Sequence, residues 1–194
     1  MSENIYIRDF LEHLKDQKYS ESTIRSYRYP LRNFFSFLAA ESGSSEPPEP
    51  AEIKLDTLEK YRLHIIDRGF EDSSVYSYIR FLKNFFVYLT EYGMIFENPA
   101  EKLENASPLK QLPEVPSQEE IHSLFSAVDV STLTGIRDRA MLETAYSCAL
   151  RVAELTSLTV KAADLESGLL RVTGKGRKER TVPLGEHAIM WIEN

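Results

Sequence analysis

Two short stretches of the sequence carry residue types that could act on a phosphate group. In the first, Arg151 and Glu154 stand three positions apart in a run of helical spacing, so both fall on one helical face. In the second, Lys175 lies between Gly174 and Gly176, whose backbones bend freely. A guanidinium can bridge two phosphate oxygens, and an ammonium can act as a point charge or proton donor. These residues would together suit a clamp for a phosphodiester.

The residues around the Gly-Lys-Gly sequence predict a β-hairpin with a basic tip. Apolar positions alternate with polar neighbours on both sides of the loop: Leu170, Val172, Val182 and Leu184. Five basic residues against one acidic residue, Glu179, give positions 171–180 a local charge of +4. The five are Arg171, Lys175, Arg177, Lys178 and Arg180. We expect the last three of them to contact DNA.

Each stretch also has a purely structural interpretation. Arg151 could form only a surface ion pair with Glu154, worth about 0.2–0.5 kcal/mol. The Gly-Lys-Gly loop could be a solvated turn. A nucleotide-binding P-loop is excluded because its Gly-x-x-x-x-Gly-Lys-Ser/Thr pattern does not occur there.

Composition indicates an ordinary globular protein with one large or two small domains. The 194 residues are 42% hydrophobic and 27% charged. No apolar run approaches the roughly 20 residues of a membrane span, and the first residues lack a basic start and an apolar core. We therefore expect a cytoplasmic protein with no membrane partner. A net charge of −7 argues against a protein that coats nucleic acid indiscriminately.

Cysteine and histidine usage gives no sign of a metal centre. Cys148 is the only cysteine, so it cannot form an intrachain disulfide, and its apolar surroundings predict a buried thiol. The four histidines are scattered without the spacing of metal ligands. We expect no metal site.

The first half of the chain predicts helices. Apolar residues recur at helical spacing in residues 4–17, 22–40, 56–68 and 72–92, with Ser22 as the expected N-cap of the second helix and glycines ending the last two. The second and fourth helices repeat each other at an offset of 51 residues, with eight identities in the seventeen positions that start at 22 and 73. We interpret this as a helix hairpin used twice, although two amphipathic helices can also converge on similar patterns.

The polar faces of the two repeated helices suit contacts with DNA. Basic and hydroxyl side chains on these faces could reach phosphates and base edges. The candidates are Arg25, Arg28, Arg32, Ser77, Arg80 and Lys83. The alternative is that both faces are merely solvated.

A proline-containing stretch separates the predicted helices from a second region. We place a helical domain at residues 1–103, a linker at 104–116 and a second domain at 117–194. The second domain opens with a capping box, Ser117 to Glu120, and continues with a helix over residues 131–149.

The motif around Arg151 and the Gly-Lys-Gly hairpin, in this order, resemble those of the tyrosine recombinases, the phage-integrase and Xer-like family. The resemblance implies a mainly α fold with a small β-hairpin or sheet. It would consist of an N-terminal helical (SAM-like, core-binding) DNA-binding domain and the first part of a mixed α/β catalytic domain. The implied function is site-specific DNA recombination or integration, with double-stranded DNA and other recombinase protomers as partners and no metal or nucleotide cofactor.

The same resemblance implies a role for each residue of the proposed clamp. In the family, a tyrosine hydroxyl attacks a DNA phosphodiester and forms a 3′-phosphotyrosyl link. Arg151 would stabilise the non-bridging oxygens as charge builds on phosphorus. Lys175 would serve as general acid to the leaving 5′-oxygen, and Glu154 would support the site.

Two departures from the family pattern lead to further expectations. Ala149 stands where the family commonly has glycine, and alanine tolerates positive φ poorly. The family's His-x-x-Arg motif and tyrosine nucleophile do not occur among these residues, and Tyr27, Tyr78 and Tyr146 fall at apolar positions typical of a core. We therefore expect a C-terminally truncated form that binds DNA without cutting it. The alternatives are a non-catalytic DNA-binding protein and a helical protein-interaction module.

Overall fold

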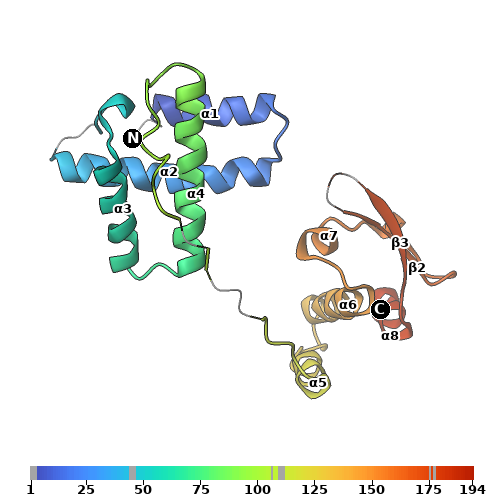
Figure 1. Cartoon of the computed structure of the whole chain (residues 1–194). Helices are drawn as coiled ribbons and strands as arrows, with labels where there is room; N and C mark the ends of the chain where they lie inside the picture. Colours follow the sequence, from blue (N-terminus) through green and yellow to red (C-terminus); the bar gives the residue numbers. More distant parts are fainter. Residues whose placement is uncertain (1–3, 44–46, 106, 109–111, 175, 177) are drawn as a thin grey trace. The chain divides into compact units, whose positions relative to one another are not determined.

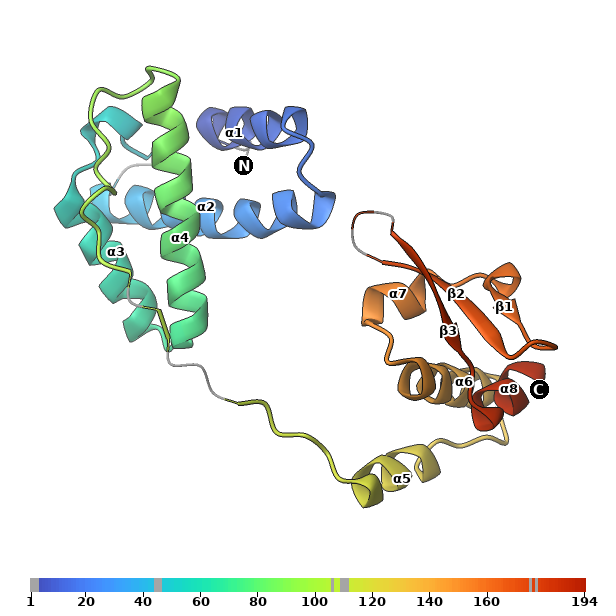
Figure 2. The same cartoon turned by 45° about the vertical axis from the view of Figure 1, so that its right-hand side comes forward.

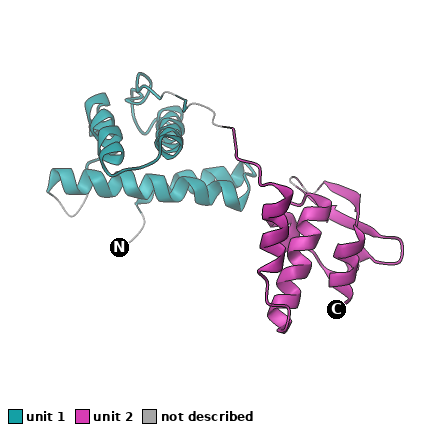
Figure 3. Cartoon of the chain, turned by 90° about the horizontal axis from the view of Figure 1, so that it is seen from below, with its two compact units in different colours: residues 1–111 teal, residues 112–194 magenta. Residues whose placement is uncertain are grey.

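The chain forms two compact units. The computed structural model describes residues 4–43, 47–105, 107–108, 112–174, 176 and 178–194. Unit 1 comprises residues 1–111 and unit 2 residues 112–194 (Figure 3). The boundary falls inside the stretch of residues 104–116 that the sequence indicates as a linker.

Unit 1 consists of two helix pairs that cross each other. The helices are α1 (Ile5–Asp16), α2 (Glu21–Ser42), α3 (Leu55–Asp67) and α4 (Asp72–Glu91), with a short 3-10 turn, η1 (Pro50–Glu52), before α3. Helix α1 lies beside α2, α3 lies beside α4, and the second pair crosses the first (Figures 1 and 2). Such crossing lets the apolar stripe of each helix face the same central core.

The helix ends follow local capping chemistry. Helix α2 is capped by the hydroxyl of Ser20, which accepts a hydrogen bond from the backbone N–H of Thr23 at 3.2 Å, so the predicted cap Ser22 was wrong by two residues. Gly69 and Gly93 follow the ends of α3 and α4 with φ of 77° and 68°, which confirms their predicted role as helix stops.

The repeated helices α2 and α4 use their matched residues alike. Leu31, Phe34, Leu82 and Phe85 are all fully buried in the aromatic core of unit 1. The hydroxyls of Ser26 and Ser77 each donate to the carbonyl four residues earlier, Ser22 and Ser73, at 3.0 and 2.9 Å. The matched asparagines, Asn33 and Asn84, each bond a buried tyrosine of a neighbouring helix, Tyr61 at 2.7 Å and Tyr27 at 2.8 Å. The sequence repeat therefore corresponds to a repeat of structural roles.

Unit 2 places helices against one side of a small sheet. Its elements in chain order are α5 (Gln118–Ser126), α6 (Leu133–Cys148), α7 (Val152–Thr156), η2 (Val160–Ala162), β1 (Ala163–Asp164), β2 (Leu169–Thr173), β3 (Glu179–Pro183) and α8 (Glu186–Glu193). Within the described residues the strands form an antiparallel sheet in the order β1-β2-β3. Helices α6 and α8 lie side by side below it (Figure 2).

The predicted hairpin and its alternation are confirmed. Leu170 and Val172 of β2 are buried between exposed neighbours and pack with Leu184, Ala188 and Cys148. The capping box of Ser117 and Glu120 at the start of α5 is confirmed as well. Strand β1 was not predicted, because it is only two residues long and leaves no alternation in the sequence. The fold is mainly α with a small sheet, as the family resemblance implies.

Candidate functional site

A turn at Ala149 sets the position of Arg151. Helix α6 ends at Cys148, and the next residue, Ala149, adopts the left-handed conformation with φ 48° and ψ 48°. The chain then turns so that Arg151 becomes the residue preceding α7. Ala149 therefore occupies the positive-φ position where the family pattern has glycine, at the steric cost that a Cβ atom adds there.

Glu154 holds Arg151 in two ways. Its Oε2 accepts a hydrogen bond from the backbone N–H of Arg151 at 2.9 Å, which caps the start of α7. Its Oε1 accepts from Nη1 of Arg151 at 3.0 Å. The side chain of Arg151 remains 76% exposed whereas that of Glu154 is only 4% exposed. A buried carboxylate thus fixes an arginine whose guanidinium faces the surface.

The same carboxylate binds a second arginine from the hairpin. Nη1 and Nη2 of Arg180 on β3 donate to Oε1 and Oε2 of Glu154 at 2.8 and 2.9 Å. These bonds from Arg180, followed by the backbone N–H of Arg151, lower the pKa of Glu154 from its ordinary 4.5 to about 2. The ion pair raises the pKa of Arg180. Glu154 is therefore a carboxylate anion throughout the physiological pH range.

The base of the hairpin loop packs against this ion pair. A Cβ atom on Gly174 would lie 3.1 Å from Oε1 of Glu154 and 3.4 Å from Nη1 of Arg180. The backbone N–H of Gly174 donates to the carbonyl of Lys178 at 2.8 Å and so closes the loop. Lys178 is exposed. The predicted residues Lys175 and Arg177 lie outside the described residues.

The predicted DNA-facing residues of unit 1 have different surroundings. On α2, Arg25, Arg28 and Arg32 are exposed. On α4, the guanidinium of Arg80 is exposed and lies 5.3 Å from the ring centroid of Phe81.

Two of the residues on α4 that are predicted to contact DNA form hydrogen bonds within unit 1. The ammonium of Lys83 donates to the carbonyl oxygens of Leu103 at 2.8 Å and Glu101 at 3.3 Å. The hydroxyl of Ser77 donates to the carbonyl of Ser73. Lys83 therefore holds the segment that follows α4 along this helix.

Arg139 is a residue of unit 2 whose position the sequence analysis did not predict. It donates to Glu143 at 3.0 Å and to the carbonyl of Phe125 at 2.7 Å. Its guanidinium also lies 5.1 Å from the ring centroids of Phe125 and Trp191. It thus joins α5, α6 and α8. The spacing of four between Arg139 and Glu143 is the only signal in the sequence that points to this pair.

The tyrosines divide into buried and exposed groups. Tyr27 is buried, as predicted, and Tyr78 is half-buried. Tyr146 on α6 is 57% exposed and touches the ring of Phe125 edge-on, so its interpretation as a core residue was wrong. Its place in an apolar run misled the prediction because α6 buries Glu143 and Thr144 on its inner side.

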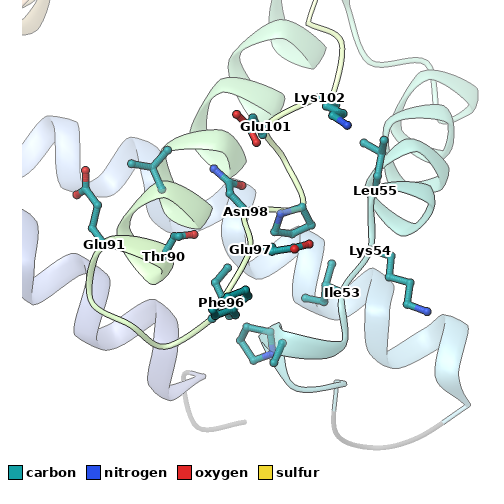
Figure 4. A pocket seen from close by; sticks show the side chains of 15 residues that line it. Ile53, Lys54, Leu55, Thr90, Glu91, Phe96, Glu97, Asn98, Glu101 and Lys102 are labelled. Atoms are coloured by element: carbon teal, nitrogen blue, oxygen red, sulfur yellow. The ribbon is translucent and has the colours of Figure 1, made fainter.

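A surface groove of about 1280 Å³ lies elsewhere, in unit 1, and contains none of the predicted site residues. It runs between the end of α4 with the segment that follows it and the start of α3 (Figure 4). Its rim carries Glu91, Glu97, Glu101, Lys54 and Lys102. Among the residues that the structure describes, no group of three or more His, Cys, Asp or Glu side chains is placed to hold a metal ion.

Comparisons with known proteins match both units. Residues 7–93 match the phage integrase N-terminal SAM-like domain, and residues 115–194 match the phage integrase family. Tyrosine recombinase XerD of Pseudomonas putida is 39% identical over 188 residues, which cover 96% of this chain and 61% of the relative. Tyrosine recombinase XerC of Chlorobaculum parvum is 34% identical over 203 residues, with 95% and 60% covered.

The chain belongs to the phage integrase family, and the resemblance that its motifs indicate is confirmed. It spans about three fifths of the length of these curated relatives. The crystal structure of a lambda integrase dimer bound to a COC′ core site has a TM-score of 0.73 at 16% identity, with 97% of this chain and 67% of that chain covered, which shows a shared fold. Among the helices that the structure describes, none has the length and apolar character that a membrane crossing needs.

Proposed function

We propose that this chain acts in site-specific DNA recombination as a tyrosine recombinase, with duplex DNA and further recombinase protomers as its partners. The main observation that supports the proposal is that the guanidinium of Arg151 is exposed while the carboxylate that holds it, Glu154, is buried. Only Nη1 of Arg151 is used by Glu154, so further donors of this guanidinium can reach a phosphate. A fixed arginine at the surface is the group that a phosphodiester requires as charge develops on its oxygens.

Arg151 is proposed to bind the non-bridging oxygens of the scissile phosphate. Lys175 directly follows Gly174, which packs against Glu154, and this adjacency supports the proposal that Lys175 protonates the leaving 5′-oxygen. Attack by a tyrosine hydroxyl would form a phosphotyrosyl bond and release that oxygen. The covalent link conserves the energy of the phosphodiester, so the reverse attack rejoins the strand without a nucleotide cofactor.

Unit 1 and the hairpin are proposed to hold the duplex. Arg25, Arg28, Arg32 and Arg80 supply exposed guanidiniums for phosphate contacts, and Lys178 adds an ammonium in unit 2. Two relatives are named tyrosine recombinases, and the lambda integrase structure is a dimer on DNA, which supports the same partners here. We propose that the protein meets these partners in the cytoplasm.

The first test measures binding of the 194-residue polypeptide to a short fluorescent duplex over a series of salt concentrations. The double variant Arg25→Gln and Arg32→Gln should flatten the dependence of log K on log salt by about two units, one for each lost phosphate contact. Arg8→Gln is the matched control, because Arg8 is an exposed arginine on α1 that pairs with Asp9 at 3.1 Å. If the double variant retains the affinity and slope of the wild type, the proposed DNA-facing surface is wrong.

The second test asks whether this polypeptide forms a covalent bond to DNA. Tyr27 and Tyr61 are buried and hydrogen bonded, which makes them unsuitable as nucleophiles. We therefore expect residues 1–194 to bind a suicide DNA substrate without a denaturant-resistant adduct. An adduct mapped to one of its tyrosines, such as Tyr146 in unit 2, which is 57% exposed, would overturn this expectation.

A further inference from the structure

One carboxylate is shared by two arginines with different exposure. Glu154 accepts four hydrogen bonds, two from Arg151 and two from Arg180, all between 2.8 and 3.0 Å. Arg180 uses both of its terminal nitrogens in a bidentate contact and has a side chain 38% exposed, half the value for Arg151. The geometry leaves Arg151 as the outward-facing member of the cluster.

Arg180 also determines how much positive charge remains at Arg151. Two guanidiniums and one carboxylate give the cluster a net charge of +1. Glu154 alone would neutralise Arg151, and an anionic phosphate would then gain little attraction there. Because Arg180 satisfies Glu154 with a bidentate pair, the remaining positive charge stays at the exposed guanidinium of Arg151.

Arg180 also fixes where the hairpin begins its loop. It lies on β3 opposite Val172 of β2, which is fully buried. Gly174, two residues after Val172, lies so close to Oε1 of Glu154 and Nη1 of Arg180 that a larger side chain would press on the ion pair. The contact between β3 and Glu154 therefore couples the position of Gly174, where the loop begins, to that of Arg151.

We propose that Arg180 is a positioning residue for Arg151 rather than a DNA contact: through Glu154 it keeps the charge of Arg151 available to phosphate, and it holds Gly174, where the hairpin loop begins, beside the ion pair. This inference rests on the proposed role of Arg151 in binding DNA phosphate. It differs from the expectation of the sequence, where the place of Arg180 in a basic run indicates a direct contact with phosphate. Lysine cannot replace it fully, because an ammonium cannot form the bidentate pair.

The test is a double-mutant cycle on duplex binding by the 194-residue chain. Arg180→Gln should weaken binding on the order of tenfold, the loss of one charge-assisted hydrogen bond to phosphate, while Arg151 is present. In an Arg151→Gln background the same change should have less than about a twofold effect, because nothing is left for it to position. Lys178→Gln, an exposed neighbour on the hairpin, should weaken binding equally in both backgrounds. An Arg180→Gln effect that persists without Arg151 and lowers the salt slope by about one unit would overturn the proposal.

A second measurement, the pKa of Glu154, tests the contact between Arg180 and Glu154 in the absence of DNA. Carbon NMR of the Glu154 carboxyl should show its pKa near 2 in the wild type and higher, toward 4.5, in Arg180→Gln, with an intermediate value in Arg180→Lys. Trp191 fluorescence checks that each variant is folded. If Arg180→Gln is unfolded, Arg180→Lys is measured in its place. A pKa that stays near 2 in both variants would show that Arg180 does not hold Glu154. If the wild type binds no duplex at all, the proposed function fails, and the carboxyl titration alone decides the role of Arg180.

Discussion

Glu154 is the residue on which the candidate site depends, and its low pKa gives a pH dependence of known sign. Because its pKa is lower in the folded chain than in the unfolded chain, the unfolded chain binds more protons between about pH 4.5 and 2. The stability that Glu154 contributes is therefore complete above about pH 4.5 and is lost as the pH falls through 2.

Unfolding of unit 2 by urea, followed by Trp191 fluorescence, should become easier as the pH falls from 4.5 toward 2. Glu154→Gln should be less stable than the wild type at neutral pH and should lose less stability over this interval. The difference between the two proteins isolates Glu154 from other carboxylates with lowered pKa, such as Asp164. Parallel curves for the two proteins would contradict the prediction.

Ala149 holds a left-handed backbone conformation that glycine adopts without strain. A non-glycine residue in the left-handed region costs about 1–2 kcal/mol, and glycine removes this cost but gains entropy in the unfolded chain. Ala149→Gly should therefore stabilise unit 2 by a net value of about 0.5–1 kcal/mol. Ala145→Gly, inside α6, is the matched control and should destabilise by about the same amount. A loss of stability in Ala149→Gly would mean that the turn before Arg151 does not need positive φ.

The start of α6 also depends on a glycine, Gly135, because the backbone of Asp129 lies close to it. A Cβ atom on Gly135 would lie 1.8 Å from the carbonyl oxygen of Asp129, so the loop before α6 would have to move. Gly135→Ala should destabilise unit 2 by about 1–3 kcal/mol despite the higher helix propensity of alanine. Thr134→Ala, at the exposed neighbouring position, should change stability by less than about 0.5 kcal/mol. Urea unfolding of both variants checks this, and a stabilising effect of Gly135→Ala would refute the close approach.

The elements show what sequence patterns can and cannot predict. Helices with long apolar stripes were placed within one or two residues because burial, capping and glycine stops agree there. The hairpin and the closeness of Arg151 to Glu154 also follow from local spacing. The bond between Arg180 and Glu154 joins residues 26 positions apart, and no local pattern encodes such a contact. For the same reason the contacts of Lys83 with the carbonyls of residues 101 and 103 were not foreseen.

At the scale of the whole molecule, the two units have cores of different size. Unit 1 buries large aromatic side chains such as Phe34, Phe85 and Phe86 completely. The core of unit 2 is a smaller set of aliphatic residues, and Met141 and Leu142 of α6 remain half-buried. Since burial of apolar surface is the main stabilising contribution, we expect unit 2 to be the less stable unit.

This difference predicts two unfolding transitions. Trp191 is the only tryptophan and belongs to unit 2, so its fluorescence should change at a lower urea concentration than the far-ultraviolet circular dichroism, to which the helices of unit 1 contribute strongly. Leu31→Ala in unit 1 should shift only the later transition. Coincident transitions by both signals in the wild type would show that the chain unfolds as one cooperative unit.

Cys148 makes it possible to time the openings of unit 2. It is the only cysteine of the chain, it is buried, and its Sγ donates to the carbonyl of Pro183 at 3.4 Å, so it bridges the end of α6 and the end of β3. Burial raises the pKa of its thiol, which keeps it unreactive while the two elements stay together. The rate at which a thiol reagent modifies the native protein therefore counts how often the sheet separates from α6. The modification rate of this single thiol therefore reports the opening of unit 2, which carries Arg151, and does not report the opening of unit 1.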